Sequence, residues 1–264
     1  MRFNKLKASD LEMVNIESKV VIVPLGAFEQ HGHHLPFSTD TAIVDAITQK
    51  AEEACPEQVL LLPPLWLGRS NQHVAFGAIS INTRTYVDVI KSICSSLIGM
   101  GARKILLISG HGGNEIPGKL ALVELKADFS SLEDLYILYV SHWKLNQRLV
   151  DLETSELLAG EQGTRLDSGI DHAGDIETSL MLYLDEEAVD MSQALAGGSR
   201  SGSDYKKCKV LNRGYPIYFT IHADEWSESG VNGIPSNGSR ESGERLCDGL
   251  TGKLVEFIHD FAVW

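Results

Sequence analysis

The chain has 264 residues, of which 43% are hydrophobic and 22% are charged, and its formal net charge is −13 at pH 7. This length and usage are typical of a globular protein with one large core, so we expect a single domain over residues 1–264. The acidic balance without a long basic run argues against nucleic acid as a partner, and no apolar stretch reaches the roughly 20 residues of a membrane-spanning helix.

The N-terminal residues and the cysteines bear on the compartment. The first ten residues lack the apolar core of a signal peptide. Cys55, Cys94, Cys208 and Cys247 are scattered, without the close pairing of a zinc knuckle. We therefore expect four reduced thiols and a cytoplasmic protein.

The first predicted strand leads directly into a group of polar residues. An apolar run over residues 19–25 predicts a buried strand. Glu29 and His31 follow on an irregular segment, and Asp40 lies at the start of a helix predicted over residues 40–54. Carboxylate and imidazole groups delivered together to a strand end suit zinc, manganese or iron. In the alternative interpretation, Asp40 only caps the helix and the other two side chains are solvated.

Strands and helices alternate along the following residues. The apolar run over 59–68 is interrupted by Pro63 and Pro64 and predicts a short or edge strand. Further apolar patterns predict a helix over 83–100, a strand over 104–110, a helix over 115–128 and a strand over 135–141. This alternation favours a three-layer α/β/α fold with a mostly parallel central sheet. Functional residues gather at the carboxyl ends of the strands in such sheets.

A glycine-rich turn follows the strand predicted over 104–110, with the sequence Ser-Gly-His-Gly-Gly-Asn. Glycines around His111 allow a tight turn and a close approach of the backbone to a ligand. His111 is thus a candidate third metal ligand. The spacing fits neither the phosphate-binding P-loop nor the dinucleotide motif. An incidental histidine in a strand-to-helix turn is the alternative.

The third group of candidate residues opens a helix predicted over 173–184. Asp175 and Glu177 lie in its first turn, where the helix dipole alone favours carboxylates. The functional interpretation places His172 and Glu177 over the same site, as a proton carrier and a further metal ligand. Because His172 lies on the turn before the helix, we expect it at the rim, facing substrate. The glycine- and serine-rich segments 197–204 and 227–243 are predicted to be loops.

Together these segments resemble the creatininase (creatinine amidohydrolase) family. The similarity rests on Val-Pro-Leu-Gly-Ala-Phe-Glu-Gln-His-Gly-His-His-Leu-Pro with Asp40, on Gly-His-Gly-Gly-Asn, and on His-Ala-Gly-Asp-Ile-Glu-Thr-Ser-Leu-Met-Leu. It extends from about residue 15 to 255, because Gly-Val-Asn-Gly-Ile-Pro at 230–235 also resembles a family segment. The resemblance implies an α/β fold with a central parallel sheet, two divalent metal ions per chain and usually a homohexamer.

The resemblance also implies a role for individual residues. Glu29 and His111 would serve one metal and His31 the other, with Asp40 bridging the two. His172 matches the histidine beside the substrate. Relatives with the Gly-Gly form of the second motif draw an acidic ligand from the Glu-Thr-Ser helix, so Glu177 takes that role, as ligand or base.

Departures from creatininase itself concern the substrate. Gly113 stands where creatininase has its acidic ligand, Gly112 replaces an aromatic residue, and no tryptophan directly precedes His172, so a creatinine ring would lose its stacking surfaces. Candidate substrate-binding residues are Ser70, His73, Gly112, Gly113 and Trp143; for Ser70 and His73, a solvated loop is the alternative.

We therefore predict a metal-dependent hydrolase that uses water activated by two metals, with His172 as proton carrier. Its substrate would be a small molecule with a non-peptide carbon–nitrogen bond, in an amide, a cyclic amide or a formamide. The alternatives are a formamide deformylase of a flavin-type pathway and a non-catalytic relative that serves as a binding or assembly module.

Overall fold

The structure is a computed structural model that describes residues 1–146, 172–198 and 222–264. Four parallel strands form its central sheet in the order β3-β1-β5-β6. They are β1 (Val20–Leu25), β3 (Val59–Leu61), β5 (Lys104–Ser109) and β6 (Tyr136–Ser141). The predicted parallel sheet is confirmed, with β3 at an edge and shorter than the apolar run that contains it, because Pro63 and Pro64 follow it.

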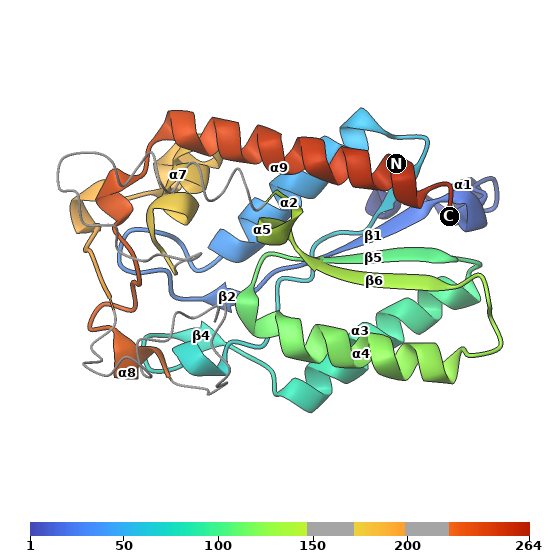
Figure 1. Cartoon of the computed structure of the whole chain (residues 1–264), viewed down its shortest axis with the longest axis horizontal. Coiled ribbons are helices and arrows are strands. Elements are labelled where there is room, and N and C mark those ends of the chain that lie inside the picture. Colours follow the sequence, from blue (N-terminus) through green and yellow to red (C-terminus); the bar gives the residue numbers. More distant parts are fainter. Residues whose placement is uncertain (147–171, 199–221) are drawn as a thin grey trace.

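Helices cover both faces of the sheet, as the alternation predicts (Figure 1). One face carries α2 (Thr39–Ala54), α7 (Asp175–Leu184) and α9 (Arg240–Phe261), and the other carries α3 (Thr83–Gly99) and α4 (Glu115–Asp128). Alternate side chains of β1 explain this: Val20 and Ile22 pack with the first set of helices, whereas Val21 and Val23 pack with the second. The three-layer α/β/α prediction is thus confirmed.

Short elements extend the layers. They are α1 (Ala8–Leu11), α5 (His142–Leu145), α8 (Ala223–Trp226) and an antiparallel ribbon of β2 (Phe28–Glu29) with β4 (Ala78–Ile79). The ribbon lies beyond the carboxyl end of β1 and places Glu29 there.

Part of the loop prediction for residues 227–243 is wrong, because α9 begins at Arg240. The hydroxyl of Ser239 accepts a hydrogen bond from the backbone N–H of Ser242 and caps this helix. Leu246, Leu250 and Leu254 then recur at helical spacing and are fully buried. Of the predicted loop 197–204, residues 199–204 lie outside the described residues.

The strand order places the loops after β1 and β5 next to each other. β1 pairs with β3 on one side and with β5 on the other. The chain therefore runs from β1 towards one edge of the sheet and from β5 towards the other edge. A crevice at the carboxyl ends of the strands is expected at such a switch point. The segments that follow β1 and β5 carry Glu29, His31 and His111.

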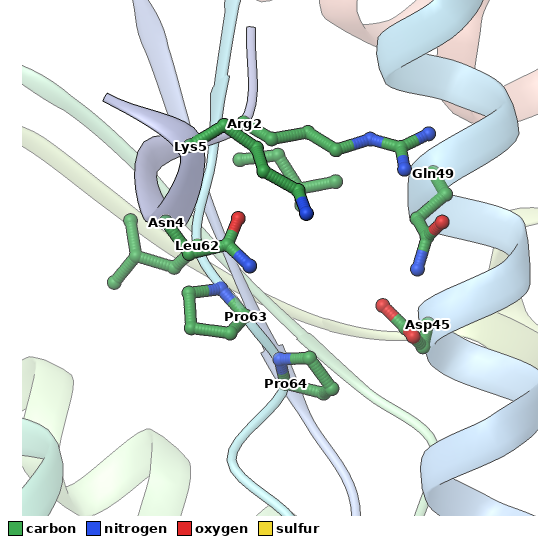
Figure 2. A pocket seen from close by; sticks show the side chains of 9 residues that line it. Arg2, Asn4, Lys5, Asp45, Gln49, Leu62, Pro63 and Pro64 are labelled. Carbon is green, nitrogen blue, oxygen red and sulfur yellow. The ribbon is translucent and has the colours of Figure 1, made fainter. Parts of the chain in front are cut away.

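A cavity of about 210 Å³ lies elsewhere, between the N-terminal segment, α2 and the residues after β3 (Figure 2). Its lining includes Arg2, Lys5, Asp45, Gln49, Pro63 and Pro64. None of the candidate site residues lines it.

Two further expectations can be compared with the structure. Among the described residues, no helix is both long and apolar enough to cross a bilayer. Cys55, Cys94 and Cys247 are buried and free of disulfides, whereas Cys208 lies outside the described residues.

Candidate metal centre

Six side chains from four separate segments meet at the carboxyl ends of β1 and β5. They are Glu29 on β2, His31 after it, Asp40 in the first turn of α2, His111 after β5, His172 before α7, and Glu177 in the first turn of α7. None is more than 8% exposed. The solvated alternative for Glu29 and His31 is therefore wrong. Asp40 is also no helix cap, because Ser38 occupies the cap position and Asp40 lies two residues further on.

Asp40 lies between two histidines. Its Oδ1 is 3.4 Å from Nε2 of His31, and its Oδ2 is 3.2 Å from Nδ1 of His111. Nδ1 of His111 is also 3.2 Å from Oε1 of Glu29, and Nε2 of His31 is 3.7 Å from Oε2 of Glu177. The carboxylate of Asp40 thus lies between two groups of candidate ligand atoms. One group belongs to His31 and Glu177, and the other to His111 and Glu29.

Each of the three histidines in the cluster donates a hydrogen bond from one ring nitrogen to a backbone carbonyl. Nδ1–H of His31 donates to the carbonyl oxygen of Glu29 (3.1 Å), and Nε2–H of His111 donates to that of Arg69 (3.1 Å). Nε2–H of His172 donates to that of Gln30 (2.7 Å). In the neutral rings the other nitrogen then carries the lone pair, and in all three it faces a carboxylate. A metal-binding histidine is usually held in this way by its second nitrogen.

Several buried atoms of the cluster are left without hydrogen bonds within the described part of the chain. They are both carboxylate oxygens of Glu29, Nε2 of His31 and Oδ2 of Asp40. Unpaired buried polar groups are costly, so a cation between them fits this donor set. Glu29, His31 and Asp40 each offer one ligand atom within 4.8 Å of the others, as do His31, His172 and Glu177, and also Glu29, His73 and His172. The residues present therefore suit divalent metal ions with mixed nitrogen and oxygen ligands.

The charges in the cluster shift its pKa values strongly. Burial alone would lower the pKa of His31, but the carboxylates of Asp40 and Glu177 outweigh it and raise that pKa to about 10. Burial likewise opposes the ionised form of Glu29, yet His111 and His73 lower its pKa to about 2. Burial raises the pKa of Glu177 to about 7. The carboxylates thus require positive charge beside them, from protons or from metal ions.

A sharp turn places Glu177. Ala173 has a φ of 54°, and its backbone N–H donates to Oε2 of Glu177 (2.6 Å). At Gly113 a Cβ atom would overlap the carbonyl oxygen of Arg69 and Nε2 of His111, so this backbone has no room for a side chain there. Gly113 therefore supplies no acid, whereas Glu177 places a carboxylate oxygen 3.7 Å from Nε2 of His31.

His172 is not at the rim, contrary to the expectation from its place before the helix. It is 8% exposed, and its ring lies between those of His31 and His73 at centroid distances of 4.4 and 4.2 Å. Two backbone hydrogen bonds with Asn232, of 3.0 and 2.8 Å, draw this turn inward.

The predicted substrate-binding residues separate into two groups. Ser70 and His73 are buried beside the cluster, so they are not solvated loop residues; Nε2 of His73 is 3.5 Å from Oε1 of Glu29. Gly112 and Gly113 form a short turn directly after His111. Trp143 is 4% exposed and packs in the core on the α2 and α9 face, next to His142. Its contact with substrate stays a prediction.

Sequence reasoning missed two features of the site. Gln30 lies between Glu29 and His31, and its amide contacts both His73 and His172. Arg69 contributes its backbone carbonyl to His111. A backbone contact leaves no trace in residue type, but the polar Gln30 between two candidate ligands was a usable signal.

Comparisons with known proteins identify the family of this chain. The creatinine amidohydrolase (creatininase) family model matches residues 4–258. A creatinine amidohydrolase from Pseudomonas putida is 30% identical over 186 residues, which cover 67% of this chain and 68% of that protein. A mycofactocin precursor peptide peptidase from Mycobacterium tuberculosis is 27% identical over 250 residues, which cover 91% of this chain and 85% of that protein.

Solved structures support the same fold. A creatininase crystal structure matches with a TM-score of 0.80 at 22% identity, covering 98% of this chain and 96% of that one. Solved creatininases that share the fold include a Zn–Zn form and a manganese form. With its family match over residues 4–258 and this fold, the chain belongs to the creatininase family.

Proposed function

We propose that this protein is a metal-dependent hydrolase that cleaves the carbon–nitrogen bond of an amide, a cyclic amide or a formamide. One observation carries the proposal: buried carboxylates face the lone-pair nitrogens of histidines whose other nitrogens are held by backbone carbonyls. A structural ion-pair network would not leave both oxygens of the buried Glu29 carboxylate without hydrogen bonds in the described part of the chain. Buried groups with strongly shifted pKa values, such as Glu29 and His31, gather at catalytic sites.

Two metal ions, zinc, manganese or iron, would be held by overlapping sets of side chains. Glu29, His111 and Asp40 would hold one, and His31, Asp40 and Glu177 the other, so that Asp40 bridges them. The carboxylate oxygens of Asp40, which face different histidines, support this assignment. When bound, such ions supply a water of lowered pKa and polarise the carbonyl oxygen of the substrate.

His172 would carry the proton in this reaction. Burial, together with His73 and His31, holds its pKa well below the ordinary value, so its ring is neutral at pH 7. Its Nε2 is engaged by the carbonyl of Gln30, which leaves Nδ1 facing the cluster, 3.7 Å from Oε1 of Glu29. A neutral, oriented imidazole can accept a proton and pass it to a leaving nitrogen. Glu177 is the alternative base, since its pKa is raised to about 7.

The substrate would be bound beside Ser70, His73, Gly112 and Gly113. The names of the two relatives indicate two candidate substrate classes, a small cyclic amide and a peptide. The peptidase match extends over 91% of this chain against 67% for the creatinine amidohydrolase, which favours a peptide amide as a second candidate. A formamide deformylase and a non-catalytic binding or assembly module are the remaining alternatives. The homohexamer and the cytoplasmic location also stay predictions.

Two measurements test the proposal. Elemental analysis should find close to two divalent transition metals per chain, as purified or after reconstitution with zinc or manganese. The metal-loaded protein should then hydrolyse at least one member of a panel of amides, lactams, formamides and short peptides. A protein that binds no metal under any of these conditions would contradict the proposal, and one that binds metal but hydrolyses nothing would favour the binding module.

A further inference from the structure

The inference concerns Gln30, a buried residue between Glu29 and His31 that is 3% exposed. Two backbone groups orient its side-chain amide. Oε1 accepts a hydrogen bond from the N–H of Gly32 (2.8 Å), and Nε2 donates to the carbonyl oxygen of Gly230 (3.0 Å). Because the backbone group at one end is a donor and the backbone group at the other end is an acceptor, the amide cannot be flipped.

Nε2 of Gln30 has two hydrogens and three neighbours, which are the carbonyl of Gly230, Nδ1 of His73 at 2.9 Å and Nε2 of His172 at 3.0 Å. One hydrogen goes to Gly230. Nε2 of His172 already donates its own hydrogen to the backbone carbonyl of Gln30 (2.7 Å), so it has no lone pair to offer. The second hydrogen of Gln30 must then go to Nδ1 of His73.

An imidazole that accepts at Nδ1 carries its proton on Nε2. Nε2 of His73 faces Oε1 of Glu29 at 3.5 Å, so it points a donor at this carboxylate. In their neutral forms, His31, His111 and His172 each point a lone pair at a carboxylate instead. His73 has the position of a metal ligand, beside Glu29 and His172, but the opposite proton placement.

We propose that Gln30 is a positioning residue that fixes the Nε2–H tautomer of His73, so that His73 points an N–H at Glu29 and does not serve as a metal ligand. The same residue orients His172 through its backbone carbonyl. The role of Glu29 as a ligand rests on the proposed function, whereas the tautomer of His73 does not.

The segment around Gly230 completes the arrangement. Gly230 has a φ of 77°, and a Cβ atom there would overlap the amide of Gln30. Asn232, two residues later, pairs with the backbone of His172. This loop therefore holds both Gln30 and His172 in place.

The test is solid-state ¹⁵N NMR of histidine-labelled full-length protein, with and without zinc, in which the signals of His73 are identified by their absence in His73→Gln. We expect a protonated Nε2 and an unprotonated, zinc-free Nδ1 in the wild type. Gln30→Glu keeps the shape but replaces the donor with an acceptor, so the proton should move to Nδ1. A proton on Nδ1 or zinc on Nε2 in the wild type would overturn the proposal.

Ser227→Ala is the matched control, because it removes a hydrogen bond to Val231 (2.7 Å) in the same loop without touching Gln30. It should leave the tautomer unchanged; the same reversal there would assign the effect to loop packing and contradict the proposal. The NMR readout needs no turnover, so it fails separately from the hydrolase proposal. If a substrate is found, Gln30→Glu should lower kcat by roughly 10–100-fold while His73→Gln, which keeps a donor at the Nε2 position, loses less than His73→Ala.

Discussion

Nε2 of His31 lies 3.7 Å from Oε2 of Glu177, although 145 residues separate the two in the chain. His31 follows β2, whereas Glu177 comes from the first turn of α7 on one face of the sheet. The backbone N–H of Ala173 donates to the same oxygen of Glu177 (2.6 Å) and holds the carboxylate in this place. Gly113 has no room for a side chain, so we propose Glu177 as the acid of the site.

Glu177→Gln should therefore remove about one metal equivalent per chain. The amide oxygen of glutamine still accepts from Ala173, so the turn should stay folded while the ligand charge is lost. Asp175→Asn is the matched control: Asp175 is a buried carboxyl in the same helical turn whose pKa burial raises to about 6, and we place it in neither ligand set. Elemental analysis should find two metals in Asp175→Asn; equal metal content in both variants would remove Glu177 from the ligands.

Asp40→Ala should lose both metals, because its two oxygens face His31 and His111 separately. His31→Ala and His111→Ala should each weaken one metal more than the other. Equilibrium dialysis against zinc separates these patterns. If Asp40→Ala retained both metals, its role would be only that of an acid in a helical first turn, worth about 0.3–1 kcal/mol.

The sheet and four of the six clustered side chains could be predicted from sequence because both follow from local patterns. Buried apolar runs placed β1 and β5, and parallel strands bring their carboxyl ends together, so Glu29, His31, Asp40 and His111 could be expected to meet. The helix α9 was not predicted, although its leucines recur every four residues. The glycine- and serine-rich composition before it extended the predicted loop to residue 243, beyond the start of the helix at Arg240.

The contribution of α7 could not be derived from spacing. Nothing local to residues 172–177 says that this turn packs onto the end of β1; the functional interpretation placed it there without a local signal, and the family resemblance supported that placement. The burial of His172 arises from contacts with Asn232 and with the carbonyl of Gln30, both far away in sequence. Backbone contacts of this kind decide which nitrogen of each histidine faces the site, and residue types do not encode them.

His142 should make the protein sensitive to acid. Burial lowers its pKa to about 4 from the ordinary 6.5, against smaller opposing effects of the Ser109 carbonyl and Asp40. Between pH 6.5 and 4 the unfolded chain takes up a proton at this histidine more readily than the folded protein does. The free energy of unfolding is therefore unaffected by this group above pH 6.5 and falls, by up to roughly 3 kcal/mol, as the pH decreases towards 4. His142→Asn keeps a donor for the carbonyl of Ser109 and does not titrate.

Denaturant unfolding of chelator-treated protein between pH 7.5 and 4.5 checks this expectation. The variant loses packing at every pH, so only the change with pH is informative. The wild type should lose more stability than His142→Asn over this range. Parallel pH curves for the two proteins would show that His142 is not the group responsible.

Creatinine should be a poor substrate. Gly112 offers no side chain for ring stacking, and no tryptophan stands directly before His172 in the sequence. The measurement is creatinine turnover by protein loaded with zinc or manganese, beside the amide and peptide panel. Turnover of creatinine at the kcat/KM of about 10⁴ M⁻¹s⁻¹ or more that enzymes reach on their own substrates would contradict this view of the pocket.

The last prediction separates the roles of His172 and Glu177. His172→Ala should keep its fold and both metals, because Glu29, His31, Asp40, His111 and Glu177 provide the proposed ligands without it. It should lose roughly 10²–10⁴-fold in turnover, the usual contribution of general acid–base catalysis.

The competing possibility is that His172 is itself a metal ligand. It offers a ligand atom close to those of His31 and Glu177, and also to those of Glu29 and His73. Metal content of His172→Ala and Glu177→Ala, measured side by side, decides between them. If His172→Ala loses a metal while Glu177→Ala keeps both, the two roles are reversed, and Glu177, with its pKa raised to about 7, becomes the proton carrier.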